Sequence, residues 1–469
     1  MRRSARVAAF LVAGVIALSF AYDLMRMPVQ VGDALGEILA AQQTPSVSSA
    51  FWGSAGTSGY LRPLRIAQIK GLFDLAAGEH YWLVYRGFHA LLLLAAVWLF
   101  TRALGVQDWR DWAAAVFALT VLTGLHTFRG TVRESFPINH FLEIAVFCLV
   151  ALNLARSRGG WWADVGAVVT FVFASLTLES GLLVWVVVVA AWLSGMRGIS
   201  RRGLAGITVM LAAYLAIRFV YLSTGTPGLE ERSAGFGFGV LESDQLQARF
   251  ADNPLPFYVY NVLASIMSVL FAEPQSGVFW LTRAVTTGDS VPPRLWLPVV
   301  SSIATTALIA WAGIRIIRRR HTMEEPDRLL VVFAAVLLAN AALSYAYTKD
   351  EIISVAGVFY ALAAYAAARL AIEHVPASAL RRVALCAVVA AIATGWVVRS
   401  AGAHHVLRTQ AFKHKNDWAR MPQAQLRDEG SPEERRAAAL VRQLQRDAIA
   451  MRVTNPFLLP RWEDRWWSE

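Results

Sequence analysis

Long apolar runs alternate with shorter polar segments along most of the chain. A helix that crosses a membrane needs roughly 20 mostly apolar residues, and the runs approach this length once their flanks are counted. The pattern predicts an all-α, polytopic membrane protein of about eleven transmembrane helices. The apolar runs are residues 5–22, 88–104, 112–125, 138–154, 163–178, 182–193, 204–222, 295–317, 329–347, 352–372 and 383–398.

Basic residues beside these runs predict the orientation, because Lys and Arg concentrate on the cytoplasmic side. Arg2, Arg3 and Arg6 precede the first run and place the N-terminus in the cytoplasm. The other Arg-rich connections then fall on the same side, provided that residues 257–271 form a re-entrant or interfacial helix on the outer side. An uncleaved first span is favoured over a signal peptide, since no small-residue cleavage site follows it.

Composition agrees with lipid as the surrounding solvent. Of 469 residues, 56% are hydrophobic and 16% are charged, whereas about a quarter of a soluble domain is charged. The net charge of +11 comes from basic residues at the ends of apolar runs, so membrane lipids are expected as partners and nucleic acid is not. Cys148 and Cys386 lie inside apolar runs, which indicates packing rather than a disulfide.

Three segments outside the apolar runs divide the chain. Residues 1–400 form the membrane domain, with a first external loop at 23–86 and a second at 223–294, and residues 401–469 form an external tail. In the tail, Ser431-Pro-Glu-Glu434 has the N-cap, the first-turn Pro and the capping-box Glu that begin a helix. The tail also has Trp462, Trp466 and Trp467, and Trp is enriched at membrane interfaces.

Ionisable residues on the predicted outer side are mixed in sign, unlike the Arg-dominated inner side. Acids and guanidinium groups gathered at one face suit an outward-facing site for an anionic substrate. Ion pairs that only neutralise the loops are the alternative. The residues concerned are Asp23, Asp33, Glu37, Arg62, Arg65, Arg86, Arg129, Arg133, Glu134, His140, Glu143, Glu179, Arg218, Lys349, Asp350 and Glu351. Asp33 begins a short amphipathic, juxtamembrane helix, and its side chain acts either as the N-cap of that helix or as a catalytic base. Glu37 lies one turn along on the same face of the helix.

Two patterns that would bind phosphate or metal are incomplete. Gly235-Phe-Gly-Phe-Gly239 lacks the Lys-Ser/Thr of a phosphate loop and is interpreted as part of an acceptor-binding external loop. His126, Glu134 and His140 fall near one loop without the ligand spacing of a metal site. No cofactor is therefore predicted, and a divalent metal stays an unsupported alternative.

Three short segments resemble a known family. They are Gly32-Asp33-Ala-Leu-Gly-Glu37, Tyr60-Leu-Arg-Pro-Leu64 and Thr177-Leu-Glu-Ser-Gly181. Their order resembles membrane glycosyltransferases of the GT-C superfold, in the branch of protein mannosyltransferases, aminoarabinose transferases and lipopolysaccharide-core sugar transferases. The chain departs from that pattern at Ala34, where a second acid is usual, and at Leu178, where Lys is common.

The resemblance implies an inverting glycosyltransferase in a bacterial inner membrane. It would move a sugar from a polyprenyl-phosphate donor to a glycan, lipid or protein acceptor at the outer face. Asp33, with Glu37 beside it, would act as general base, a contribution of about 10²–10⁴ in rate. The donor phosphate would be bound by Arg62, Arg129, Arg133, Arg218 and Lys349, and Glu179, Glu134 and Asp350 would have structural or acceptor-side roles.

Two functions of other classes stay open. A secondary transporter would place ionisable residues near the bilayer midplane in two related halves. The runs here are apolar at their centres except at Asn340, and no internal repeat is visible. A non-catalytic scaffold of envelope assembly would use the external loops and the tail to bind partners, and would tolerate loss of Asp33 or Arg62.

Overall fold

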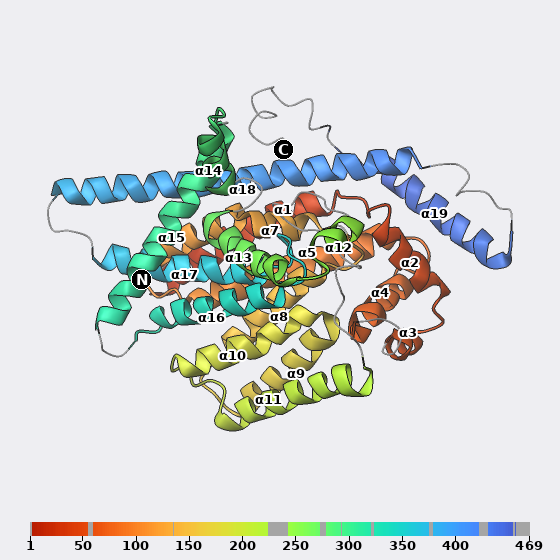
Figure 1. Cartoon of the computed structure of the whole chain (residues 1–469), viewed down its shortest axis with the longest axis horizontal. Coiled ribbons are helices and arrows are strands. Elements are labelled where there is room, and N and C mark those ends of the chain that lie inside the picture. The colour runs from red at the N-terminus through yellow and green to blue at the C-terminus, as the bar shows by residue number, and fades with distance from the viewer. Residues whose placement is uncertain are drawn as a thin grey trace.

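The computed structural model describes residues 2–54, 60–134, 136–223, 243–272, 278–291, 293–319, 323–374, 379–421, 430–453 and 455. This part of the chain is helical and contains no strand (Figure 1). The elements are α1 (Arg2–Leu24), α2 (Asp33–Gln43), α3 (Val47–Ser54), α4 (Pro63–Leu75), α5 (Tyr81–Leu104), α6 (Trp109–Gly124), α7 (His126–Arg133), α8 (His140–Ala155), α9 (Trp161–Thr177), the 3₁₀-helix η1 (Glu179–Leu182), α10 (Leu183–Leu193), α11 (Arg201–Leu215), the π-helix η2 (Ala216–Tyr221), α12 (Ser243–Phe250), α13 (Leu255–Phe271), α14 (Val278–Thr287), α15 (Pro293–Arg319), α16 (Asp327–Leu343), α17 (Ser354–Glu373), α18 (Ala379–Ala419) and α19 (Pro432–Ala450).

Every apolar run predicted to span the membrane coincides with a helix or with two consecutive helices. Within the described ranges, five helices are long and apolar enough to cross a bilayer, and α6 with α7, bent by 57°, makes a sixth candidate. The helices α8, α9, α13 and the pair η1–α10 are apolar but shorter. The membrane character is confirmed by these helices, whereas the count of eleven crossings stays a prediction.

The centre of the bundle is α17, which contacts α6, α8, α15 and α16. Nearly all of its side chains are buried, and half of them are Ala or Gly. A helix that is apolar on all sides is expected inside a bundle, and small residues let neighbouring backbones approach closely. Gly357 illustrates this, because a Cβ at that position would overlap the Thr127 hydroxyl of α7.

The interrupted apolar run at 257–271 forms α13, which lies against α15, α16 and α17. The polar residues that interrupt it are buried, and they form hydrogen bonds to neighbouring segments. Asn261 donates to the Tyr345 carbonyl at 2.9 Å, and Ser265 and Thr348 hydroxyls are 2.6 Å apart. These polar residues therefore face the bundle, and the re-entrant or interfacial assignment stays a prediction.

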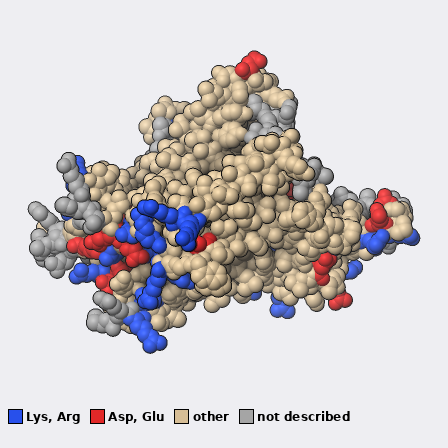
Figure 2. Space-filling view, turned by 90° about the horizontal axis from the view of Figure 1, so that it is seen from below, with Lys and Arg blue, Asp and Glu red and all other residues tan. Residues whose placement is uncertain are grey.

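Connections predicted to be cytoplasmic meet at one end of the bundle. Arg156 binds Glu325 at 2.9 Å, Arg369 binds Asp111 at 2.7 Å, and Arg6 donates to the Val106 carbonyl at 3.3 Å. Figure 1 shows the N-terminus at the left end, whereas α2, α3, α4 and α19 lie together at the right. In Figure 2, charged side chains gather densely at one end, and a broad band beside them is formed by other residues. Charged ends separated by an apolar band are the arrangement expected for a protein that spans a membrane.

The last predicted span belongs to a much longer helix. α18 has 41 residues, which at 1.5 Å per residue is about twice the thickness of a hydrocarbon core. The boundary expected at 400/401 therefore lies inside a helix, because no Pro interrupts residues 399–419 and the polar residues there are compatible with a helix. The predicted helix after Ser431 is confirmed as α19, with a complete capping box to Glu434.

Candidate functional site

The site begins in the segment between α1 and α5, which was predicted to be the first external loop and in which α2 carries two acids. Asp33 is the first residue of α2 and is exposed, but its side chain makes no capping hydrogen bond. Gly32 occupies the N-cap with φ 98°, a conformation that favours glycine. The interpretation of Asp33 as the helix cap is therefore wrong, because the chain enters the helix one residue earlier than expected.

Glu37 joins α2 to α4 through an ion pair with Arg65, whose Nη2 donates to Glu37 Oε1. Both side chains are largely buried, with 22% and 16% of their surface exposed. Burial raises the pKa of Glu37, although the Arg65 charge opposes this and the Asp33 charge adds to it. Glu37 is thus fixed to α4, while Asp33 stays accessible at the start of the same helix.

Arg62 connects the first loop to the hairpin between α9 and α10. Its Nε donates to both Glu179 oxygens, at 2.9 and 3.2 Å, and its Nη2 donates to Oε2 at 2.6 Å. The guanidinium also lies 4.0 Å from the centre of the Tyr60 ring. The structure therefore brings together the segments 60–64 and 177–181, which are far apart in sequence and were each singled out by their residues.

The position of Glu179 depends on an abrupt turn. α9 ends at Thr177, Leu178 is extended, and η1 begins at Glu179. Gly181 follows in this turn, where a Cβ would overlap the backbone of Ala174. Only glycine allows the turn to pack this closely on α9, and the turn directs Glu179 toward the first loop.

A second guanidinium lies on the other side of Glu179. Arg218 Nη1 is 3.6 Å from Glu179 Oε1 and 3.3 Å from the Tyr214 hydroxyl, and 7% of the Arg218 side chain is exposed. Arg218 belongs to the π-helix η2, and single π turns occur often at functional sites. Glu179 thus orients two guanidinium groups, and the three side chains together carry a formal charge of +1.

Gln68 was not predicted to belong to the site, although it lies on α4 three residues after Arg65, which itself follows the N-cap residue Arg62 by three residues. Gln68 Nε2 donates to Glu143 Oε1 at 2.5 Å, and the buried His140 Nδ1 lies 3.6 Å from Glu143 Oε2. The spacing of three residues along α4 was the available signal, because side chains at i and i+3 are neighbours on a helix.

The other predicted residues form a second group around α7. Arg129 and Arg133 are on α7, Glu134 follows it, and Lys349 and Asp350 lie in the turn before α17. Asp350 is buried, with Oδ1 3.6 Å from His126 Nε2. The turn is close to α7, because Gly130 contacts Asp350. These residues therefore gather around α7 rather than around the Arg62–Glu179 pair.

A metal site at His126, Glu134 and His140 was only an unsupported alternative, and His126 has another partner in the structure. His126 Nε2 is 2.7 Å from the Ser268 hydroxyl, and among the described residues no group of three His, Cys, Asp or Glu side chains could hold a metal ion. Asn340, the polar exception among the apolar runs, bonds the Ile352 carbonyl and the Ala356 amide at 3.1 Å each. Its role is thus to join α16 to α17. The Gly235–Gly239 segment and Trp462, Trp466 and Trp467 lie outside the described residues.

Comparison with known proteins gives one distant likeness. No family model matches the chain, and no curated protein sequence matches it. Among solved structures, the chain is similar to the crystal structure of ArnT from Cupriavidus metallidurans bound to undecaprenyl phosphate. The alignment has a TM-score of 0.43 and 14% identity, and it covers 94% of this chain and 77% of that chain. A likeness this distant assigns neither an activity nor a ligand to the chain.

Proposed function

We propose that this protein is an integral membrane glycosyltransferase that uses a polyprenyl-phosphate-linked sugar donor at the outer face of the inner membrane. The observation that carries the proposal is the contact of Arg62, Glu179 and Arg218, in which two segments that resemble GT-C enzymes meet. The site lies where the predicted first external loop meets the helices α11 and η2, which together are long and apolar enough to cross a membrane. A lipid-linked donor suits this place, because its tail can lie between helices while its phosphate reaches the charged residues.

The guanidinium groups supply what the leaving phosphate needs. Charge develops on the phosphate as the glycosidic bond breaks, and fixed cations stabilise that charge. Guanidinium forks bind two phosphate oxygens at once, and Glu179 holds Arg62 and Arg218 in fixed positions from between them. Arg129, Arg133 and Lys349 of the α7 group are the further cations that the proposal assigns to the donor phosphate.

The two acids of α2 have different roles in this proposal. Asp33 is the general base, since it is exposed and can meet an acceptor hydroxyl. It takes the hydroxyl proton while the acceptor oxygen attacks the anomeric carbon, and the polyprenyl phosphate leaves with the electrons of the broken bond. Glu37 is a positioning residue, because its ion pair with Arg65 holds α2 against α4. Glu134 and Asp350 remain on the acceptor side in this scheme.

The test compares complemented deletion strains that contain equal amounts of the protein in their membranes. Asp33→Asn is expected to abolish transfer, whereas Glu37→Gln is expected to reduce it by weakening the α2–α4 contact. Glu79→Gln is the matched control, because Glu79 is an exposed acid of the same loop. Mass spectrometry of envelope glycans reports the outcome. Full restoration by Asp33→Asn would show that Asp33 is not the base.

A further inference from the structure

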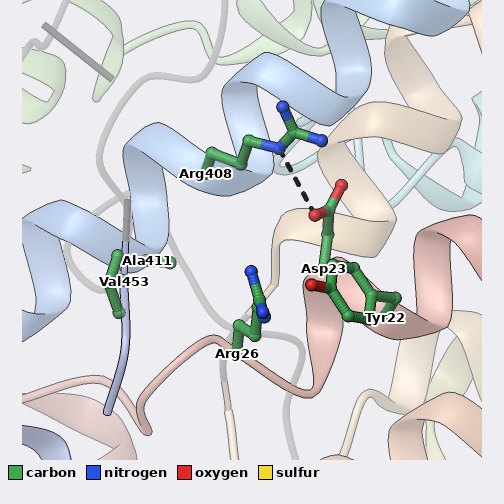
Figure 3. Close-up of a pocket in the computed structure, with 6 residues that line it drawn as sticks. All are labelled: Tyr22, Asp23, Arg26, Arg408, Ala411 and Val453. Atoms are coloured by element: carbon green, nitrogen blue, oxygen red, sulfur yellow. Dashed lines mark hydrogen bonds and ion pairs between the residues drawn. The ribbon is translucent and has the colours of Figure 1, made fainter. Parts of the chain in front are cut away.

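A charged pocket lies between the end of α1 and the second half of α18, and none of its residues belongs to the candidate site (Figure 3). Its cavity of about 250 Å³ is lined by Tyr22, Asp23, Arg26, Arg408, Ala411 and Val453. A second cavity of about 450 Å³ shares Tyr22, Asp23 and Arg408 and extends the first toward Ser19, Ala401 and His404. The two cavities form one continuous depression along the α1–α18 contact.

Asp23 is buried at the base of the pocket, where it contacts His404 and Arg408. Its side chain is 3% exposed, its Oδ2 is 2.7 Å from His404 Nδ1, and its Oδ1 accepts from Arg408 Nε at 3.4 Å. Figure 3 shows the two terminal nitrogens of Arg408 directed away from this contact. The guanidinium carbon of Arg26, a second basic residue of the pocket, lies 4.1 Å from the centre of the Tyr22 ring. Two guanidinium groups and one carboxylate leave the pocket with a net positive charge, even with His404 neutral.

The pocket continues into an apolar surface. Leu11, Val15, Leu18 and Tyr22 follow one another at helical spacing on α1, and their side chains are 56–70% exposed. On α18, Val397 is 50% exposed and Ala401 lines the second cavity. An exposed apolar stripe on a predicted span is the face that lipid chains cover. The depression is therefore apolar toward the bilayer and basic where the first predicted span ends.

We propose that this pocket binds an anionic phospholipid from the outer leaflet of the membrane that the protein spans. The phosphate lies between Arg26 and Arg408, and an acyl chain follows the stripe of α1. Arg matches phosphate geometry through its fork of donors, and two guanidinium charges favour an anionic headgroup. Tyr22 suits the headgroup level, where aromatic side chains with a polar end are enriched. The proposal rests on the membrane placement of α1 and is independent of glycosyl transfer.

The bound lipid would hold α18 against α1, since the two arginines come from different elements. Asp23 is a positioning residue here, because it neutralises part of the charge and binds Arg408 through Nε, which leaves the terminal nitrogens of Arg408 for a phosphate. The ligand therefore bridges the end of α1 and the second half of α18, which the structure brings side by side.

The test uses the purified full chain, freed of lipid and titrated with phosphatidylglycerol in mixed micelles, with retention measured by native mass spectrometry. The double variant Arg26→Gln/Arg408→Gln is expected to bind phosphatidylglycerol about tenfold more weakly. The control, Arg420→Gln/Arg435→Gln, removes two exposed arginines elsewhere in the C-terminal region and is expected to change affinity less than about twofold. Leu18→Asn, on an exposed position that folding does not need, is expected to weaken lipid binding about threefold.

Two further arms distinguish the ligand sources. Inorganic phosphate at millimolar concentration should not displace the lipid, and phosphatidylcholine should bind at least about tenfold more weakly, because its cation opposes the two arginines. Equal retention of phosphatidylglycerol by the Arg26/Arg408 variant would overturn the proposal. So would full displacement by inorganic phosphate, which would indicate an anion site without a lipid, or equal binding of phosphatidylcholine.

Discussion

The ion pair between Arg62 and Glu179 permits a quantitative prediction of stability. Glu179→Gln keeps the shape of the side chain but removes the charge that lies between Arg62 and Arg218. Arg62 and Arg218 then both lose the carboxylate that they contact. Arg62→Gln is milder, because Glu179 still has Arg218 at 3.6 Å.

The exposed fractions of the side chains set the magnitude. Removing one partner of a fully buried pair costs about 3–5 kcal/mol, whereas an exposed pair is worth about 0–1 kcal/mol. Arg62 and Glu179 are 24% and 21% exposed and Arg218 is 7% exposed, so the site lies between these limits. We expect about 2 kcal/mol for Glu179→Gln, about 1 kcal/mol for Arg62→Gln, and about 2 kcal/mol for the double variant rather than their sum.

The assay is thermal unfolding of the detergent-purified protein at one fixed scan rate, since large membrane proteins unfold irreversibly. A loss of about 2 kcal/mol corresponds to a few degrees in apparent Tm. Glu79→Gln is the control and should leave the apparent Tm unchanged, because Glu79 is exposed. Additive losses in the double variant would refute the reasoning, as they would mean that the two side chains do not interact.

Three further predictions concern other parts of the chain. Burial lowers the pKa of His414 to about 4, and the charges of Arg86 and Lys413 lower it further. The folded protein therefore binds a proton at His414 more weakly than the unfolded chain does. The free energy of unfolding should fall by roughly 2–3 kcal/mol as the pH drops from about 6.5 to about 4. His414→Gln should flatten that dependence in unfolding measured across this pH range. Gly181→Ala should sharply reduce the folded yield in fluorescence-detected size exclusion, whereas Gly36→Ala, where a Cβ meets nothing, should not. Ser431→Ala should lower the stability of α19 by about 1 kcal/mol, measured by hydrogen exchange.

Hydrophobic pattern alone predicted the helices of the long apolar runs, because such a run in a membrane protein satisfies its backbone best as a helix. The short helices α3, α7, α12 and α14 were not predicted. The capping residues of Ser431-Pro-Glu-Glu434 were likewise sufficient for the start of α19, since capping depends on neighbours in sequence. The pattern did not predict the length of α18. Nothing in residues 399–419 stops a helix. An apolar run, however, predicts only the part of a helix that lipid surrounds, and this segment is polar.

Contacts between distant segments were out of reach of the sequence. Arg62 and Glu179 were both selected as charged outer residues, yet their pairing depends on how α4 packs beside α9. Asp33 was expected as a cap or a base, and only the backbone at Gly32 decided against the cap. The pocket at Asp23 was missed because His404 and Arg408 lie in what was predicted to be a tail.

The central claim, glycosyl transfer from a polyprenyl-phosphate donor, is tested most directly by comparing a deletion strain with the same strain restored by the wild-type chain. Mass spectrometry of envelope glycans and of lipid-linked sugars measures both acceptor and donor. We predict a glycan short by one sugar in the deletion strain, with the carrier-linked sugar accumulating, and restoration of both by the wild type. Unchanged glycans and unchanged lipid-linked sugars in the deletion strain would contradict it and would favour a transporter or a scaffold.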